Sequence, residues 1–137
     1  MNIEILDTIS LKDYKMLIES AGWKILSDKQ HQNALDNSMI LSTAICDNKV
    51  IGFARIVGDN STHGLLCDVV VHPDYQRKGI GKKLTDSLKE KVYNMLDDKE
   101  QFLIELLPAA GKKDFYLACG FKYKPEHMDG MYLWIKK

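Results

Sequence analysis

Eight residues near the middle of the chain, Gly64 to Val71, limit the possible folds more than any other segment. The run reads GLLCDVVV and is apolar except for one acid, Asp68. A nearly continuous apolar run of this kind predicts a central strand that is covered on both faces. Pro73 ends the strand, and apolar residues spaced by three and four from Leu84 onward then predict an amphipathic helix. We therefore expect helices packed in layers on a sheet.

Short strands and helices alternate along the rest of the chain. Ser10 precedes apolar residues at helical spacing and is expected to cap a helix. Ser27, with Gln30 three residues later, is expected to cap a second, shorter helix. Turn residues separate the apolar stretches that we interpret as strands. The predicted helices are 11–21, 28–36, 84–96 and 112–119, and the predicted strands are 2–6, 38–46, 50–57, 64–71, 101–107, 121–123 and 131–135. The pattern predicts a mixed sheet in an α/β or α+β layered domain.

Composition excludes several classes of protein. The chain has 137 residues, the size of one ordinary domain, so we expect a single domain spanning 1–137. Nineteen basic residues balance nineteen acidic ones, which argues against a nucleic-acid partner. No apolar run approaches the roughly 18 residues of a membrane span, and the first residues lack the pattern of a signal peptide. We expect a cytoplasmic protein with no membrane partner.

The cysteines and histidines do not indicate a disulfide framework or a metal site. There are three cysteines, an odd number, and none forms a CxxC pair. They are expected to be free thiols in a reducing compartment. The four histidines show neither HxxxH nor HExxH spacing, so we expect no metal.

The segment from Gln76 to Lys82, QRKGIGK, lies between the apolar strand and the amphipathic helix. The first amides of a helix have no internal partner and carry part of the helix dipole, so an anion is expected to bind there. Gly79 and Gly81 lack a Cβ and allow a ligand to approach the backbone. Nearby lysine and arginine side chains favour a compact polyanion. The segment lacks the serine or threonine of a Walker A loop and the third glycine of a dinucleotide-binding fingerprint.

Two motifs resemble those of the GNAT acetyltransferases. Residues 69–81, VVVHPDYQRKGIG, are similar to the family's acetyl-CoA signature, V-x-P-x-x-[QR]-x-x-G-x-[GA]. Residues 114–121, DFYLACGF, resemble its second signature, an aromatic–tyrosine pair followed by Gly-Phe. The resemblance spans essentially the whole chain and extends to a bacterial and plastid branch that includes plant serotonin and lysine acetyltransferases. It implies a mixed, mostly antiparallel sheet of six to seven strands flanked by about four helices.

The resemblance also implies acetyl-CoA as co-substrate and assigns residues to it. In the family, loop amides hold the pyrophosphate and the pantetheine arm lies beside the preceding strand, in the manner of an added strand. The strand residues so implied are Val69, Val70 and Val71. The pyrophosphate cradle so implied consists of Gln76, Arg77, Lys78, Gly79, Ile80, Gly81 and Lys82. Many members have an asparagine after the next strand, but this chain has Leu107-Pro108-Ala109-Ala110 there.

The same resemblance makes Tyr116 the acid that protonates the departing thiolate, although Tyr116 could instead be a packing aromatic. Asp68 has two interpretations that the sequence leaves open. It could be a general base or an ammonium-binding group, or it could form a structural ion pair with Arg55 on the neighbouring strand. His72 and His127 are alternative bases, each more typical of an exposed loop. Cys67 as a nucleophile is disfavoured because no histidine is paired with it by spacing.

We therefore expect an N-acetyltransferase in which a primary amine attacks acetyl-CoA directly in a ternary complex. The alternative is a non-catalytic acyl-CoA-binding module, and a nucleotide-phosphate binder is a third, weaker hypothesis. The acceptor, a small-molecule amine or a protein or peptide amine, is not readable from the sequence. In such folds the first two helices and last hairpin form its pocket, where Trp23, Tyr132 and Trp134 supply aromatic surface. An edge strand at 132–134 could pair across a homodimer.

Overall fold

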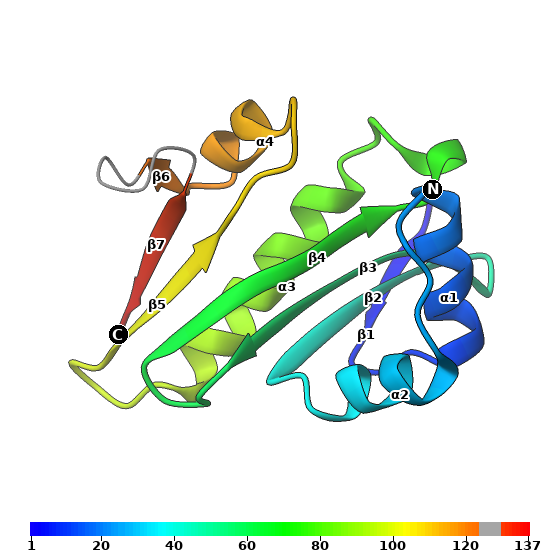
Figure 1. Cartoon of the computed structure of the whole chain (residues 1–137). Coiled ribbons are helices and arrows are strands. Elements are labelled where there is room, and N and C mark those ends of the chain that lie inside the picture. Colours follow the sequence, from blue (N-terminus) through cyan, green and yellow to red (C-terminus); the bar gives the residue numbers. More distant parts are fainter. Residues whose placement is uncertain (124–129) are drawn as a thin grey trace.

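The computed structural model describes residues 1–123 and 130–137 (Figure 1). Helices and strands alternate along the chain, with a short 3₁₀ turn at Pro73–Tyr75. The strands are β1 (Ile3–Leu6), β2 (Ile40–Cys46), β3 (Lys49–Gly58), β4 (His63–Val71), β5 (Gln101–Leu106), β6 (Lys122–Tyr123) and β7 (Met131–Lys136). The helices are α1 (Leu11–Ser20), α2 (Asp28–Asp36), α3 (Ile80–Met95) and α4 (Lys113–Ala118).

The strands form one seven-stranded sheet in the order β1-β2-β3-β4-β5-β7-β6. Neighbouring strands are antiparallel except for β4 and β5, which run parallel and are connected through α3. The predicted fold class, a mixed and mostly antiparallel sheet of six to seven strands with about four helices, is confirmed. The hairpin of β2 and β3 and the closing pair of β6 and β7 are confirmed as well.

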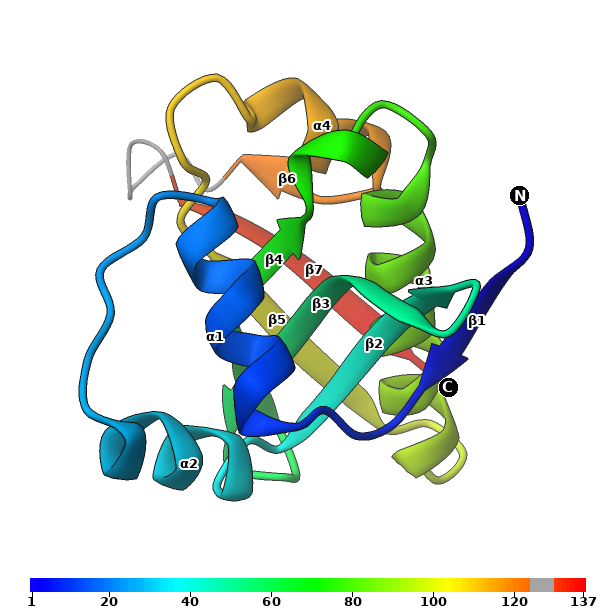
Figure 2. The same cartoon turned by 90° about the vertical axis from the view of Figure 1, so that its right-hand side faces the viewer.

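Helices cover both faces of the sheet (Figure 2). On one face, the apolar stripe of α3 packs on the central strands through Leu84, Leu88 and Val92, all of them buried. On the other face, α1 places Tyr14 and Leu17 in a second buried cluster with residues of β3 and β4. The helical periodicity of α1 and α3 therefore corresponds to the two layers of the core.

The caps that the sequence predicts for the first two helices are present. Ser10 accepts a hydrogen bond from the Asp13 amide at the start of α1. Ser27 and Gln30 form a complete capping box at the start of α2. These bonds satisfy amides that a helix leaves without a partner in its first turn, so both helices begin where the serines predict.

Two predictions about the central segment need correction. The strand is central, but the expectation that both of its faces are covered is wrong for its first half, where the Leu65 residue is 43% exposed and Cys67 is also exposed. The α1 layer reaches only the second half of β4, at Val70. The amphipathic helix also begins at Ile80 rather than Leu84, because the left-handed backbone of Gly79 starts it directly after the loop.

No helix in the part of the chain that the structure describes is both long enough and apolar enough to cross a membrane.

Candidate acetyl-CoA and acceptor site

The site begins where β4 and β5 separate. Their parallel pairing consists of three residue pairs and ends with Leu65 opposite Glu105. Strand β4 then continues to Val71, so its edge from Leu66 onward has no strand partner on the β5 side within the described residues. Figure 1 shows the two strands diverging toward α4. The gap exposes main-chain donors and acceptors of a central strand, which an extended ligand can satisfy.

A β-bulge lies at the start of this open edge. Arg55 of β3 is opposite Asp68, but the next residue of β3, Ile56, is opposite Leu66, so Cys67 is the extra residue. A bulge bends its strand and increases the local twist. The bulge therefore lies beside the point where β4 leaves β5, and it turns the Asp68 carboxylate toward α1.

The loop after β4 combines an unusual backbone with a fixed side chain. Gln76 donates a hydrogen bond from Nε2 to the carbonyl oxygen of Val71, 3.0 Å away, and so ties the loop to the end of the strand. Arg77 and Gly79 both have positive φ, +62° and +79°. That backbone leads directly into the first turn of α3, whose amides have no intrahelical acceptor.

Glycine is favoured at the two loop positions, Gly79 and Gly81, for different physical reasons. A Cβ at Gly79 would meet nothing within 4 Å, so its left-handed backbone is what favours glycine there. A Cβ at Gly81 would lie 3.0 Å from the ring of Phe115. Gly81 therefore allows α3 and α4 to pack closely and brings the loop next to the helix that carries Tyr116.

The basic side chains around the loop are partly engaged by the protein itself. Lys82 forms an ion pair with Asp86 at 2.5 Å, which also binds Lys89 at 3.0 Å. Lys78 places its ammonium 5.6 Å from the centre of the Tyr75 ring. Arg77 and Lys78 are exposed, so both cations lie where an anion at the start of α3 can reach them.

Tyr116 lies on α4 with its ring edge against two other aromatic rings. The ring centroids are 4.9 Å from Phe115 and 5.9 Å from Phe121. Burial raises the pKa of the Tyr116 hydroxyl to about 12, with smaller contributions from the charges of Cys119 and Asp68. Tyr116 is therefore protonated at neutral pH and can act as a hydrogen-bond or proton donor.

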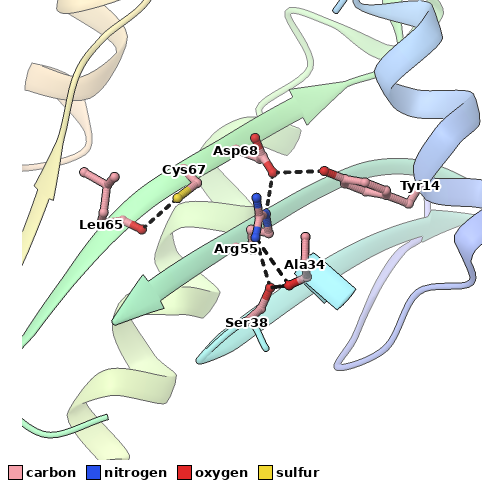
Figure 3. A network of polar contacts seen from close by, with 7 residues as sticks. All are labelled: Tyr14, Ala34, Ser38, Arg55, Leu65, Cys67 and Asp68. Atoms are coloured by element: carbon pink, nitrogen blue, oxygen red, sulfur yellow. Dashed lines mark hydrogen bonds and ion pairs between the residues drawn. The ribbon is translucent and has the colours of Figure 1, made fainter. Parts of the chain in front are cut away.

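Asp68 is at the centre of a polar network between β3, β4 and the two N-terminal helices (Figure 3). Its Oδ2 lies 2.5 Å from Nε of Arg55 and accepts a longer, 3.4 Å hydrogen bond from the Tyr14 hydroxyl. Arg55 also donates to the Ser38 hydroxyl and the Ala34 carbonyl. The ion pair that the sequence left as one of two alternatives is thus present, and the role of Asp68 as a base stays a prediction.

Burial is the main cause of a raised pKa at Tyr14, to about 12, and the Asp68 charge adds to it. The Tyr14 hydroxyl is therefore a donor to Asp68 rather than an anion beside it.

The remaining candidates from the sequence are placed less favourably. Nδ1 of His72 accepts a hydrogen bond from the Asp74 amide, which caps the 3₁₀ turn. Although Cys67 is exposed at the surface, partial desolvation of its thiol by the surrounding chain raises the thiol pKa, which disfavours the thiolate that a nucleophile needs. His127 lies outside the described residues.

All three cysteines are free thiols. Within residues 1–123 and 130–137, no group of three or more potential ligands could hold a metal.

The structure adds one pair of residues that sequence reasoning missed. A cavity of about 510 Å³ lies at the point of separation, lined by Val57, Gly58, Asp59, His63, Gly64, Leu65, Glu105, Leu106, Leu107 and Gly130. In it, Nε2 of His63 lies 2.5 Å from Oε1 of Glu105. Glu105 is the single acid in the apolar strand QFLIELL, the same signal that singled out Asp68. Its pairing with His63 depends on the parallel register, which the sequence does not show.

One of the predicted aromatic residues of β7 lies opposite the residue that carries the same carboxylate. The register places Tyr132 opposite Glu105 and Trp134 opposite Leu103. Trp23, by contrast, is exposed on the segment between α1 and α2. The structure therefore brings the β7 aromatics to the strand that carries Glu105.

Comparison with known proteins agrees with this architecture. Residues 37–123 match the family model described as an acetyltransferase (GNAT) domain. The chain belongs to the GNAT acetyltransferases. The matched region runs from the end of α2 to β6. It includes the open edge of β4, the loop from Gln76 to Lys82 (the glycine loop) and the helix with Tyr116. This chain is accordingly an acyltransferase, and acetyl-CoA is the acetyl donor that its family uses.

Individual relatives extend the likeness over most of this GNAT chain. An uncharacterized N-acetyltransferase ycf52 from Pyropia yezoensis is 33% identical over 128 residues, which cover 90% of this chain and 71% of the relative. A probable acetyltransferase of unknown function from meticillin-resistant Staphylococcus aureus has a TM-score of 0.79 at 20% identity, covering 90% of this chain and 92% of that one. The PaiA N-acetyltransferase from Thermoplasma acidophilum, solved in complex with coenzyme A, has a TM-score of 0.67 at 21% identity, with both chains fully covered.

Proposed function

We propose that this GNAT enzyme transfers an acetyl group from acetyl-CoA to a primary amine, which attacks the thioester directly in a ternary complex. The observation that carries the proposal is the open edge of β4, which leads into the glycine loop at the start of α3. One extended groove can thus receive both the thioester arm and the pyrophosphate. The proposed catalytic domain is the whole chain, residues 1–137.

The coenzyme is proposed to lie along this edge. The pantetheine amides pair with the main chain of the strand at Val69, Val70 and Val71. The pyrophosphate is held by loop amides, the start of the helix and the adjacent cations, at Gln76, Arg77, Lys78, Gly79, Ile80, Gly81 and Lys82. A main-chain N–H near Val69 or Val70 is proposed to meet the oxyanion that forms during attack. Support comes from the unpaired edge and from the left-handed backbone that opens the loop.

Tyr116 is proposed to protonate the departing thiolate. A free thiol has a pKa of about 8.5, so a proton shared with the leaving sulfur lowers the cost of expelling it. Its burial keeps the Tyr116 hydroxyl protonated, with a pKa of about 12, throughout the neutral range. Its ring contacts with Phe115 and Phe121 hold the hydroxyl in one orientation.

The acceptor must lose a proton before it attacks. An alkylamine with a pKa of about 10.4 is almost entirely ammonium at pH 7, and baring it costs about 4–5 kcal/mol. Asp68 is the proposed base, directly or through water, and its charge can also attract the ammonium group. The Oδ2 atom of Asp68 already accepts two hydrogen bonds. Glu105, which lines the cavity and is paired with His63, is the second carboxylate to be tested.

A thiol-release assay with acetyl-CoA against a panel of amines, aminoglycosides and peptides tests the proposal. We expect turnover with at least one primary amine and a loss of turnover in Asp68→Asn or Glu105→Gln at neutral pH. An unchanged pH–rate profile in Asp68→Asn would remove Asp68 from the mechanism. Tight acetyl-CoA binding by calorimetry, with no thiol release from any amine, would instead support the alternative of a non-catalytic acyl-CoA-binding module.

The proposed partners are a small-molecule amine or a protein or peptide amine, in a cytoplasmic setting that the free thiols favour. A homodimer through β7 is also proposed. Strand β6 pairs with β7 only at Met131 and Tyr132, so the β7 edge from Leu133 to Lys136 extends beyond that pairing in the described chain. Size-exclusion chromatography with light scattering tests it, and a monomer at assay concentration would contradict it.

A further inference from the structure

The segment that joins α1 to α2, residues 21–27, presents an apolar surface to solvent. Trp23, Ile25 and Leu26 are all exposed in it. Figure 2 shows this segment passing along the same face of the sheet as α1. The Asp68 network faces the same layer, because the Tyr14 hydroxyl reaches Asp68 from α1. Residues 21–27 and the Asp68 network therefore lie on the same side of the sheet.

One buried side chain fixes this segment. His31, in α2, is only 5% exposed although its ring carries two polar nitrogens. Its Nε2 accepts a hydrogen bond from the amide of Leu26 at 2.8 Å. Since Nε2 accepts, this bond assigns the ring proton to Nδ1. This bond is separate from the capping box, in which Ser27 and Gln30 begin the helix without any contribution from His31.

The same ring contacts the residue that binds Asp68. The His31 ring packs edge-on against Tyr14, with centroids 5.5 Å apart, and the Tyr14 hydroxyl donates to Asp68. The other end of α2 is also tied to this network, because Arg55 donates to the carbonyl of Ala34. His31 thus binds the main chain of residues 21–27 at Leu26 and also packs on Tyr14, whose hydroxyl binds the Asp68 carboxylate.

We propose that His31 is a positioning residue for the amine acceptor: it holds residues 21–27 in place as one wall of the acceptor side, on the face of the sheet where Tyr14 binds Asp68. The inference rests on the proposed function and deepens it. His31 does not touch the coenzyme loop or Tyr116 in this arrangement, so its contribution falls on acceptor binding. Removing the Nε2 acceptor frees the Leu26 amide and loosens the wall, while the glycine loop and the open edge of β4 keep their geometry.

Steady-state kinetics of three variants test the role. His31→Leu fills a similar volume without an acceptor, and we expect it to raise the KM for the amine about two- to tenfold, the range of one net hydrogen bond. The KM for acetyl-CoA should stay unchanged. His31→Gln can still accept from the Leu26 amide, and should stay close to the wild type. Leu35→Ala is the matched control, since Leu35 is a buried residue of α2 in the same cluster as Tyr14. It should lower stability without raising the amine KM.

The proposal is overturned if the amine KM of His31→Leu is unchanged, or if it rises equally in His31→Gln and Leu35→Ala. A second measurement needs no substrate. The chain has two tryptophans, so a Trp134→Phe background leaves Trp23 as the single reporter in the segment. Acrylamide quenching of Trp23 should increase in His31→Leu and not in His31→Gln, and equal quenching in all variants would also overturn the proposal. A wild-type enzyme that acetylates no amine would contradict the proposed function, while the quenching result would still decide whether His31 holds the segment.

Discussion

The Nε atom of Arg55 lies 2.5 Å from Oδ2 of Asp68, and the two residues are register partners on adjacent strands. Both side chains are largely covered, with 14% and 15% of their surfaces exposed. The pair lies at the β-bulge where β4 begins its open edge. The free-energy cost of removing both charges from water is offset only while the two side chains remain paired. The geometry at the start of the open strand edge therefore depends on this one ion pair.

Breaking the pair from one side should be strongly destabilising. Arg55→Met leaves the Asp68 carboxylate in a mostly covered site, and we expect the free energy of unfolding to fall by about 2–4 kcal/mol. Combining Arg55→Met with Asp68→Asn should cost less than the sum of the single changes, because the uncompensated charge is gone. Urea denaturation of the four proteins measures the coupling. Strictly additive costs would show that the pair contributes no mutual stabilisation.

Tyr116→Phe removes the proposed proton donor and keeps the ring. We expect kcat to fall by about a hundredfold at neutral pH, the lower end of what a positioned acid contributes, with little change in the KM for acetyl-CoA. Because burial raises the pKa of Tyr116 to about 12, its ionisation should not limit the rate below about pH 11. Tyr93→Phe, at an exposed tyrosine near the end of α3, is the control and should retain full activity. Full turnover of Tyr116→Phe would leave the residue a packing role only.

Two glycines of the loop should respond differently to alanine. Gly79→Ala forces a Cβ onto a left-handed backbone, so we expect a loss of about 1–2 kcal/mol in stability and a higher KM for acetyl-CoA. Gly81→Ala pushes on the Phe115 ring, which neighbours Tyr116, so its main effect should be a lower kcat. Gly22→Ala, at φ +71° with nothing within 4 Å, imposes the same strain elsewhere.

Thiol-release kinetics separate these effects. If Gly22→Ala raised the KM for acetyl-CoA as much as Gly79→Ala, the change would reflect general destabilisation and not the loop.

The secondary structure was largely predictable because its causes are local. Ser10 and Ser27 mark the helix starts through bonds made within a few residues, and the apolar spacing of α3 marks the face that it buries. The turn residues between β2 and β3 likewise act within the hairpin itself. The start of α3 was missed because Ile80 stands between Gly79 and Gly81, and glycines are typical of a loop. Ile80 nevertheless continues the apolar spacing of Leu84 and is buried.

The site was predictable only where a motif is continuous along the chain. The loop from Gln76 to Lys82 is one segment, so its position before a helix could be inferred directly. The His63–Glu105 pair joins two strands separated by α3, and it exists because parallel pairing places Leu65 opposite Glu105. Asp68 was recognised as an acid in an apolar strand, but its approach to Tyr14 depends on where α1 crosses the sheet. These contacts arise from tertiary packing, which residue spacing does not encode.

Asp59 gives a pH dependence that can be traced to one turn. Its carboxylate accepts hydrogen bonds from the amides of residues 61, 62 and 63 and from the Thr62 hydroxyl. These bonds hold the pKa of Asp59 well below its ordinary value of about 3.8, the Thr62 hydroxyl contributing most. A depressed pKa in the folded state means that the stabilisation is present above the ordinary pKa and is lost as the pH falls through the folded value.

Asp59→Asn should therefore lower the melting temperature at pH 7, and the difference from the wild type should shrink as the pH is lowered from about 4 toward about 2. Thermal unfolding followed by circular dichroism across this range measures it. Asp98→Asn, at an exposed acid in the turn after α3, controls for the loss of one negative charge. A difference that stays constant down to pH 2 would mean that Asp59 stabilises the turn independently of its charge. This turn joins β3 to β4 and lines the cavity that also contains Glu105. In the case of a constant difference, the charge of Asp59 would therefore not determine the shape of that cavity.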